Sequence, residues 1–457
     1  MAETDRITAL LADAAARAAR YLSEIQDRSV APTREALAGL ARLAPPLPEQ
    51  GMAAERVIAL LDEAGSPATL GTAGPRFFGF VIGGSLPATV AASVLGAAWD
   101  QNAGLRVTSP VAAALEDAAI TWLVDVLSLP PGTGVGFVTC ATTANLSGLA
   151  AARHALLARQ GWDVEGHGLF GAPALRVVVG DEVHVSVLKA LTLLGLGSER
   201  VERVPVDGQG RIRADALPRL DERTILCLQA GNVNTGAFDP AGPIVGRARA
   251  AGAWVHVDGA FGLWARAAPA LASLAAGLEG ADSWATDAHK WLNVPYDSGL
   301  VFCRDAAMLH AALRPPTAAY LVEGDFREPD QYVPEFSRRA RGIEVWAALL
   351  SLGREGLRDL LERTCAHARR FAAGLREDGH EILNDVVLNQ VLVSFGSPER
   401  TRHAIEEVQR GGVLWCSGTL WQGRTAMRIS VSSWATTAAD VERSLEGIRA
   451  AVARVSV

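Results

Sequence analysis

Six short apolar runs, separated by helical segments, occupy the middle of this 457-residue chain and limit the folds open to it. The runs are Val135–Thr139, Leu175–Val179, Thr224–Leu228, Trp254–Val257, Ser283–Thr286 and Leu300–Cys303. They are rich in Val and Leu and do not alternate with polar residues, which is typical of strands buried on both faces. Because strands separated by helices form βαβ units, the sequence predicts an α/β fold with a mostly parallel sheet.

The segments on either side of this region have a different character. Residues 1 to about 70 look helical, and Ser109-Pro110 supplies an N-cap and a first-turn proline for a further helix. The pattern changes from about residue 348 onward. Helices are predicted at 341–376 and 400–410, and they surround strands predicted near Val391–Phe395 and Met427–Val431. We therefore predict a helical N-terminal segment over residues 1–84, a large domain over 85–347 and a smaller α+β domain over 348–457.

Charge, hydropathy and cysteine usage exclude several classes of partner. The net charge of -7 gives no basic field for a nucleic acid. The N-terminus lacks the pattern of a secretion signal. Phe77–Trp99 is uncharged and long enough to span a bilayer, but its glycines and Pro87 favour a buried turn followed by a helix. The five cysteines are scattered without zinc spacing, so we expect no metal, no membrane partner and a cytoplasmic location.

Lysine occurs only at Lys189 and Lys290, and every other basic residue apart from histidine is arginine. A lysine retained in such a chain is a candidate for chemistry that arginine cannot perform. Arginine keeps its proton in proteins, whereas a lysine amine can become neutral and attack a carbonyl carbon. Lys189 follows His184 by five positions in a predicted helix, and we expect it to be a partly exposed helix residue.

Lys290 and Asp258 both follow predicted strands, and the carboxyl ends of strands in an open α/β sheet face the ligand crevice. Pyridoxal 5′-phosphate (PLP) needs this pair of groups. Its aldehyde forms a Schiff base with a lysine amine, and a carboxylate stabilises the protonated pyridine nitrogen that makes the ring an electron sink. Lys290 is therefore the candidate Schiff-base lysine, and Asp258 the candidate partner of the ring nitrogen.

Two further segments could complete such a site. Thr142 and Thr143 follow a predicted strand and precede a helix that is predicted to open at about Ala144 or Asn145, and a helix N-terminus can bind a phosphate. The alternative is an ordinary capped helix. His184 directly follows the Leu175–Val179 strand, where an imidazole could stack on the pyridine ring or relay protons, or serve only a structural purpose.

Taken together, these segments resemble the group II PLP-dependent amino acid decarboxylases, such as the aromatic-L-amino-acid and glutamate decarboxylases. The motifs with counterparts in that family are DAHKW around Lys290, HVDGA around Asp258, HVSVLKA around His184, PRFFGF at 75–80, TSPVAAALE at 108–116, AGNVNTGAFDP at 230–240 and SRRARGIEVW at 337–346. The likeness covers nearly the whole chain from about residue 75 onward.

The resemblance implies fold type I, with a mostly parallel seven-stranded sheet, and a homodimer with active sites at the interface. It also implies roles for the candidates: Lys290 as the Schiff-base lysine, Asp258 on the pyridine nitrogen and His184 stacked on the ring. Thr142 and Thr143 with His289 would hold the phosphate. The implied reaction is decarboxylation of an L-amino acid, with an aromatic one as first candidate, to the amine and CO2 through an external aldimine and a quinonoid.

The chain departs from the family pattern at several positions. Asp287, a candidate cofactor-binding residue, stands where family members often carry Asn. Asn232-Val233 stands where many have two threonines, so Asn232 is the candidate donor to the phenolic oxygen of the ring. In the family, a loop tyrosine protonates the carbanion, whereas phenylalanine there favours aldehyde formation. In this chain the loop is expected over residues 320–339, where Tyr332 and Phe326 both fit that position. We favour Tyr332 for the catalytic role, and the alternative for Tyr332 is a packing residue.

Three further residues complete the candidate set. Arg428 could bind a substrate carboxylate or form a structural ion pair, and Gln101 and Asn102 could line the pocket for the substrate side chain. The other functions compatible with the sequence are another PLP reaction on the same fold, namely aldehyde synthase, lyase or aminotransferase, and a non-catalytic PLP-fold protein.

Overall fold

The computed structural model of the chain describes residues 3–314 and 326–455. The chain forms two compact units. The larger unit comprises Gly83–Arg369 and Asn384–Val391, and the smaller unit comprises Met1–Ile82, Arg370–Leu383 and Leu392–Val457. Residues from the two ends of the chain thus cluster in the smaller unit, and the central residues form the larger one.

The larger unit contains a seven-stranded sheet with the strand order β1-β7-β6-β5-β4-β2-β3. Its strands are β1 (Gly134–Val138), β2 (Arg176–Gly180), β3 (Glu202–Val204), β4 (Thr224–Gln229), β5 (Trp254–Asp258), β6 (Ser283–Asp287) and β7 (Gly299–Cys303). The strand β7 runs antiparallel to both of its neighbours, and the other pairs are parallel. The predicted α/β class and the mostly parallel seven-stranded sheet are confirmed.

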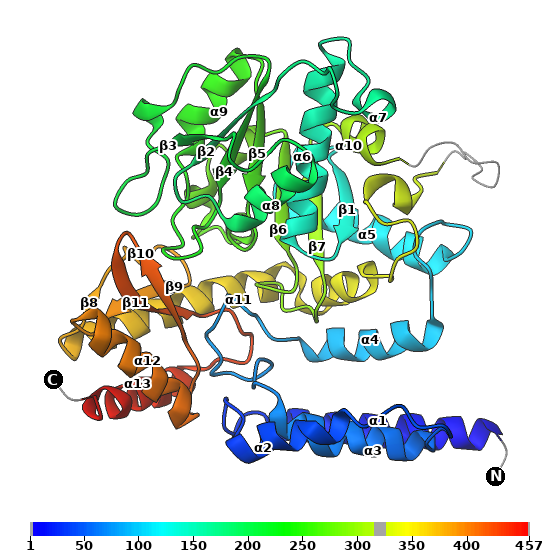
Figure 1. Ribbon diagram of the computed structural model, residues 1–457, viewed down its shortest axis with the longest axis vertical. Helices are drawn as coiled ribbons and strands as arrows, with labels where there is room; N and C mark the ends of the chain where they lie inside the picture. The colour runs from blue at the N-terminus through cyan, green and yellow to red at the C-terminus, as the bar shows by residue number, and fades with distance from the viewer. Residues whose placement is uncertain (1–2, 315–325, 456–457) are drawn as a thin grey trace. The chain divides into compact units, whose positions relative to one another are not determined.

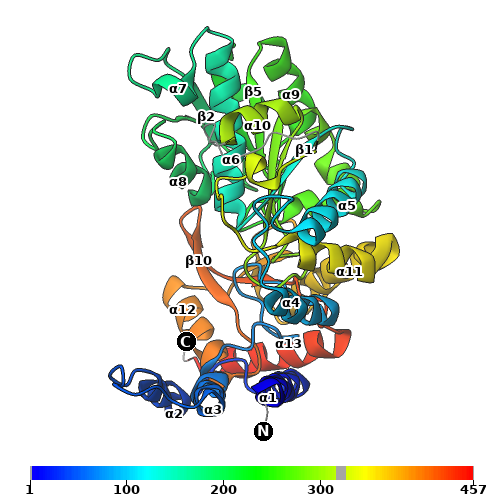
Figure 2. The same ribbon diagram turned by 90° about the vertical axis from the view of Figure 1, so that its right-hand side faces the viewer.

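The apolar runs became strands because both faces of this sheet are covered. Every residue of β1, β4, β5, β6 and β7 is buried. The long helix α6 (Ala141–Ala158) packs against β4 to β7, and its buried residues share a core cluster with residues of α8 (Val185–Leu193) and α10 (Ala306–Leu313) (Figures 1 and 2). A strand with two covered faces has no position for a polar alternation, which explains the continuous Val and Leu runs.

The remaining helices of the larger unit surround this core. They are α4 (Pro87–Trp99), α5 (Pro110–Val126), α7 (Val164–His167), α9 (Ala241–Ala250) and the first part of α11 (Gly342–Glu377), which is interrupted at Gly353. Short 3-10 helices lie at Ala214–Ala216, Gly262–Ala267, Ala272–Ala275, Leu278–Gly280 and Pro329–Tyr332. As predicted, α5 begins at Pro110, and the Ser109 hydroxyl accepts a hydrogen bond from the Ala112 N–H at 3.2 Å.

The helix α6 begins at Ala141, so the predicted start at Ala144 or Asn145 was wrong. Its N-cap residue, Cys140, makes no side-chain capping bond. Instead, the carboxylate of Asp287 accepts the Ala141 N–H at 2.5 Å. Because this cap comes from a residue 146 positions away, no local capping signal marks the helix start. Thr142 and Thr143 consequently lie inside the first turn.

The smaller unit is built on a four-stranded sheet with the order β10-β11-β9-β8. Its strands are β8 (Glu381–Ile382), β9 (Gln390–Ser394), β10 (Ser417–Trp421) and β11 (Arg424–Ser430). Its helices are α1 (Glu3–Glu24), α2 (Arg34–Gly39), α3 (Ala54–Gly65), α12 (Pro398–Gly411) and α13 (Ala438–Ala453), with 3-10 turns at Leu40–Leu43 and Ser66–Ala68. The helices α1 and α3 run side by side, as do α12 and α13 (Figure 1).

No helix in the described part of the chain combines the length and the apolar character needed to cross a membrane. Within residues 3–314 and 326–455, no group of three or more His, Cys, Asp or Glu side chains could hold a metal ion.

Candidate active site

The candidate site lies at the carboxyl ends of β5 and β6 in the larger unit. Asp258 is the last residue of β5, and β6 ends at Asp287, three residues before Lys290 in the turn that leads to β7. The strands β5 and β6 are parallel neighbours, so their ends reach the same edge of the sheet. The structure thus places the predicted acid and the predicted lysine after adjacent strands, at the edge where α/β sheets bind ligands.

The amine of Lys290 is paired with the carboxylate of Asp287. The Nζ atom lies 3.0 Å from Oδ2 of Asp287, whose side chain is 3% exposed, whereas the lysine side chain is 18% exposed. The other carboxylate oxygen accepts the Ala141 N–H at the start of α6. Asp287 therefore connects the candidate Schiff-base lysine to the helix N-terminus that was predicted to bind phosphate.

His289 lies between these groups and the start of β7. Its Nδ1 accepts a hydrogen bond from the Ser298 N–H at 3.1 Å, and its Nε2 lies 3.6 Å from Oδ2 of Asp287. Because Nδ1 is an acceptor, the proton of a neutral ring is on Nε2. Burial is the main cause that lowers the pKa of His289 below its usual value, which favours this neutral form. The ring of Tyr296 stacks on that of His289, with 4.2 Å between the centroids.

Asp258 is almost fully buried, and three donors fix its carboxylate. Its Oδ2 accepts from Nδ2 of Asn145 at 3.2 Å and faces the Ser186 hydroxyl at 3.4 Å, and its Oδ1 accepts the Ala260 N–H at 3.2 Å. These contacts hold the carboxylate in one orientation. An acid that pairs with a pyridine nitrogen has to keep a fixed position, so this environment fits the predicted role.

His184 is the N-cap residue of α8. Its Nδ1 accepts the Ser186 N–H at 3.2 Å and lies 2.8 Å from the Ser186 hydroxyl. Since Ser186 also faces Asp258, the structure links the candidate ring-stacking imidazole to the candidate partner of the ring nitrogen through one serine. Lys189 is an exposed residue of α8, in agreement with the prediction.

The predicted phosphate ligands lie in the first turn of α6. Thr142 and Thr143 are half-buried, and the Thr143 hydroxyl is 2.7 Å from that of Thr139. A helix of this length offers unpaired N–H groups and a positive dipole end to an anion. Ser298 comes after the turn that contains Lys290 and directly before β7. Its buried hydroxyl has no hydrogen-bond partner within the described residues.

Asn232 takes part in a turn of its own. Its Oδ1 accepts the N–H groups of Asn234 and Thr235, and its Nδ2 donates to Oε2 of Glu182 at 3.0 Å. In this structure the amide therefore donates to a carboxylate, and a hydrogen bond to the phenolic oxygen of PLP stays a prediction.

The two loop candidates have different surroundings. The Tyr332 ring lies 4.5 Å from the Arg327 guanidinium and 5.7 Å from the His310 ring, and it packs against the core cluster under α6 and α10. Phe326 is 69% exposed, and its contact is with Arg106, whose guanidinium is 5.3 Å from the ring. Of the loop predicted over residues 320–339, residues 320–325 lie outside the described residues.

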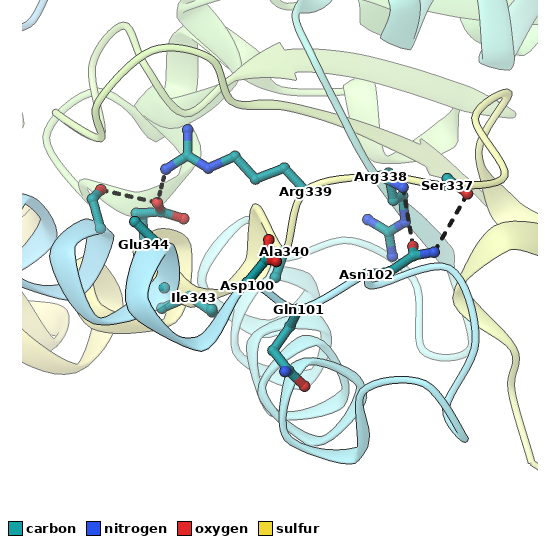
Figure 3. A pocket seen from close by; sticks show the side chains of 12 residues that line it. Asp100, Gln101, Asn102, Ser337, Arg338, Arg339, Ala340, Ile343 and Glu344 are labelled. Atoms are coloured by element: carbon teal, nitrogen blue, oxygen red, sulfur yellow. Dashed lines mark hydrogen bonds and ion pairs between the residues drawn. The ribbon is translucent and has the colours of Figure 1, made fainter. Parts of the chain in front are cut away.

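Gln101 and Asn102 line a pocket of about 750 Å³ in the larger unit (Figure 3). The Asn102 side chain accepts the Arg338 N–H at 3.2 Å and donates to the Ser337 hydroxyl at 3.3 Å, and Arg339 pairs with Glu344 on another wall. Lys290, Asp258 and His184 are not among the lining residues, so the predicted role of Gln101 and Asn102 in substrate binding stays a prediction.

Arg428 lies in β11 of the smaller unit, and its side chain is largely buried. Burial lowers the pKa of Arg428 to about 10. The guanidinium is still charged at neutral pH, which both of the roles considered for it require.

The donor set at the ends of β5 and β6 fits PLP. The cofactor needs an amine for its aldehyde, an ionised acid for its ring nitrogen and N–H or O–H donors for its phosphate. Lys290, Asp258 and the first turn of α6 with the Ser298 hydroxyl supply one of each.

Sequence reasoning missed several residues of the site. Asn145 and Ser186 contact Asp258, and Tyr296 and Ser298 contact His289. A signal for Asn145 exists in retrospect, because an amide stands among the small apolar residues of a helix that is buried on one side. Nothing local distinguishes Ser186, Tyr296 or Ser298 from ordinary loop and helix residues.

Comparison with known proteins identifies a family. Residues 67–396 match the family described as the pyridoxal-dependent decarboxylase conserved domain. A tryptophan decarboxylase of Oryza sativa subsp. japonica is 27% identical, over 79% of this chain and 77% of its own length. An acidic amino acid decarboxylase of Mus musculus is 25% identical, over 75% of this chain and 63% of its own. A phenylacetaldehyde synthase of Arabidopsis thaliana is 26% identical, over 79% and 78%.

A solved structure supports the fold. The tryptophan decarboxylase of Oryza sativa, crystallised with PLP and tryptamine, superimposes with a TM-score of 0.89 over 98% of both chains, at 23% identity. At this identity the likeness establishes the shared architecture.

Proposed function

The chain belongs to the pyridoxal-dependent decarboxylase family, and from that membership we propose which residues carry the reaction and which substrates it accepts. The protein is a PLP-dependent amino acid decarboxylase, a carboxy-lyase. We propose that its substrate is an aromatic L-amino acid, a choice supported by its similarity to the tryptophan decarboxylase of Oryza sativa. The single observation that carries the site assignment is the placement of Lys290 and Asp258 after adjacent parallel strands.

Each of the proposed residues has a separate task. Lys290 would hold the aldehyde carbon of the cofactor, and Asp258 would keep the pyridine nitrogen protonated. Bound PLP supplies the electron sink that accepts the electron pair left when the carboxyl group departs as CO2. The first turn of α6 would bind the phosphate and so fix the position of the ring.

Proton movement centres on the Lys290 amine. Its Nζ atom can share a proton with Oδ2 of Asp287 across 3.0 Å, and the neutral His289 lies 3.6 Å from the same oxygen. These contacts give the lysine a local partner for the proton it must release before it can act as a nucleophile. His184 would contact the ring face, and Tyr332 would deliver a proton to the substrate carbon.

A product assay with the purified holoenzyme tests this function. The protein is incubated with each proteinogenic L-amino acid, and CO2, amine, aldehyde and hydrogen peroxide are measured together. The proposal expects CO2 and the corresponding amine in equal amounts from at least one aromatic amino acid. Release of CO2 from acidic amino acids only would overturn the substrate class, and no CO2 release from any of them would overturn the decarboxylase activity.

One observation favours a second candidate function, aldehyde synthesis. Phe326 is 69% exposed, whereas the Tyr332 ring is packed between Arg327 and His310. If Phe326 is the loop residue that reaches a substrate, the reaction would consume O2 and water and give aldehyde, CO2, ammonia and hydrogen peroxide. The same assay separates the two, because only this reaction produces peroxide and aldehyde in equal amounts.

We also propose that the protein acts as a homodimer. The helix α4 carries no charged residue from Pro87 to Trp99, yet Thr89 is its only buried residue. Val94, Leu95 and Trp99 are 60%, 53% and 42% exposed. A contiguous apolar helix face of this kind marks a protein contact surface, and a second copy of the chain is the occupant that the family resemblance suggests.

Sedimentation of the holoenzyme tests the dimer. The proposal expects a dimer for the native chain and a shift toward monomer for Leu95→Glu, which places a charge on α4. Phe170→Glu is the matched control, because Phe170 is a 97% exposed apolar residue outside α4. A native monomer, or an unchanged dimer in the Leu95 variant, would argue against this surface.

A further inference from the structure

A chain of hydrogen bonds runs through the larger unit from Trp254 to Asp258. The Trp254 indole N–H donates to Oγ of Ser283 at 2.9 Å, and that oxygen lies 2.8 Å from Nδ1 of His256. The Nε2 of His256 lies 2.9 Å from Oδ1 of Asn145, and Nδ2 of Asn145 donates to Oδ2 of Asp258 at 3.2 Å. Asn145, His256 and Ser283 are completely buried.

The local structure explains why these side chains meet. Trp254, His256 and Asp258 occupy alternate positions of β5, so their side chains lie on the same face of the sheet. Ser283 begins β6 and is the direct partner of His256 in the parallel ladder. Asn145 comes from α6, which covers this face.

A glycine allows α6 to approach so closely. A Cβ atom at Gly148 would lie 2.7 Å from Cε1 of His256, so any larger residue would push the helix away from the strand. The close approach brings the Asn145 amide within hydrogen-bonding distance of both the imidazole and the carboxylate.

The direction of the chain is fixed by Asp258. An ionised carboxylate can only accept, which requires the NH2 group of Asn145 to face Asp258. The Asn145 oxygen then faces His256 and accepts from it, so the imidazole proton is on Nε2. The bare Nδ1 of His256 accepts the proton of the Ser283 hydroxyl, whose oxygen also accepts the Trp254 indole N–H.

The alternative arrangements bring two acceptors face to face. Moving the His256 proton to Nδ1 would set the bare Nε2 against Oδ1 of Asn145. Rotating the Asn145 amide to correct this would set its oxygen against the carboxylate of Asp258. Burial lowers the pKa of His256 to about 4, so the ring is neutral at physiological pH and one tautomer satisfies the whole chain.

Asn145 also connects to the second candidate ring contact. Its Nδ2 donates to the Ser186 hydroxyl at 3.2 Å as well as to Asp258, and Ser186 lies 2.8 Å from Nδ1 of His184. Both protons of the amide and its oxygen are therefore used. A buried network in which every group is satisfied holds its members in one geometry.

We propose that Asn145 and His256 are positioning residues that hold Asp258 ionised and oriented toward the pyridine nitrogen of the cofactor. This inference rests on the proposed role of Asp258. Asn145 donates directly to the carboxylate, and His256 fixes the orientation of the Asn145 amide. Neither residue contacts the reacting atoms in this scheme, and their influence passes through Asp258.

The test is the protonation state of the pyridine nitrogen, measured by 15N NMR on holoenzyme loaded with [15N]PLP across a pH series. We expect Asn145→Ala to lower the apparent pKa of the ring nitrogen by about one unit or more, because Asp258 loses a donor that stabilises its charge.

Two further variants keep the test informative. Ser147→Ala is the matched control, because Ser147 is a buried α6 residue whose hydroxyl donates to the Thr143 carbonyl, outside the chain. Ser283→Ala is the milder variant if Asn145→Ala does not fold, because it removes the hydroxyl that donates to Nδ1 of His256 and leaves Asn145 in place. Ser283→Ala should lower the apparent pKa of the ring nitrogen by less than Asn145→Ala does.

The outcomes separate this inference from the proposed function. A native protein that binds no PLP, or whose bound ring nitrogen is unprotonated, would overturn the role of Asp258 itself. A native protein with a protonated nitrogen, together with folded Asn145→Ala and Ser283→Ala variants that give the native titration, would overturn only the positioning role.

Discussion

Asp287 joins the amine of Lys290 to the N-terminus of α6: one carboxylate oxygen lies 3.0 Å from Nζ, and the other accepts the Ala141 N–H. The carboxylate thus holds an N–H group that a bound phosphate could otherwise use, and its negative charge would repel a phosphate bound at this helix N-terminus. The group II decarboxylases that this sequence resembles often have an uncharged asparagine at this position.

Asp287→Asn is therefore expected to bind PLP more tightly. Asparagine retains an oxygen for the Ala141 N–H but removes the charge that repels a phosphate, a change we estimate at about tenfold in Kd. The measurement is an absorbance titration with PLP and, in parallel, with pyridoxal, which lacks the phosphate. The gain should be smaller for pyridoxal. Asp282→Asn is the control, because Asp282 lies just before the start of β6, at the end opposite to Asp287, and its carboxylate accepts the Val255 N–H. An unchanged or weaker affinity of the Asp287 variant for PLP would contradict this prediction.

The two lysines allow a direct test of the Schiff-base assignment. Borohydride reduction of the native holoenzyme, followed by peptide mass analysis, should place a pyridoxyl group on Lys290 and none on the exposed Lys189. Lys189→Arg should keep the label and the absorbance of the bound cofactor, whereas Lys290→Arg should lose the label because a guanidinium does not form the bond. A label on Lys189 in the native protein would contradict the assignment.

The apolar runs were sufficient to predict most of the larger sheet. Six of its strands coincide with predicted runs, because burial on both faces leaves a continuous hydrophobic signal. The exception is β3, which has three residues, of which only Val204 is buried. A strand this short at the edge of a sheet contains too few apolar residues for its sequence pattern to be distinguished from that of a loop.

The candidate site was predictable where chemistry restricts the residue type. Lys290 and Asp258 could be singled out as candidates because few side chains can do what PLP requires of them. Asn145 and Ser186 were missed because their role depends on where α6 and α8 pack against β5, and packing of this kind leaves no local pattern. The start of α6 was missed for the same reason, since its capping carboxylate comes from a distant strand.

Replacing Tyr332 by Phe should change the products. If Tyr332 protonates the substrate carbon, loss of its hydroxyl is expected to shift products from amine toward aldehyde, measured as the ratio of the two per CO2 released. Tyr21→Phe removes a tyrosine hydroxyl in the smaller unit and should leave the ratio unchanged. An unaltered ratio in the Tyr332 variant would limit this tyrosine to packing against Arg327 and His310, and Phe326→Tyr would then be the informative variant.

His256 should make the stability of the fold depend on pH. Burial lowers the pKa of His256 to about 4 in the folded protein, whereas the unfolded chain has the ordinary value of about 6.5. Between these values the unfolded state binds the extra proton, so the contribution of His256 is fully present above about pH 6.5 and is lost as the pH falls toward 4. At pH 5 the loss is about 2 kcal/mol.

Asp239 acts in the opposite direction, because burial raises its pKa to about 7 and the folded state then binds protons more readily. A comparison of the native protein with His256→Gln cancels that effect, since Asp239 is present in both. Thermal unfolding of the two holoenzymes at pH 7.5 and pH 5 should show the larger fall in Tm for the native protein. Equal falls would mean that His256 does not remain neutral in the folded state, and the single tautomer on which the positioning of Asn145 depends would lose its support.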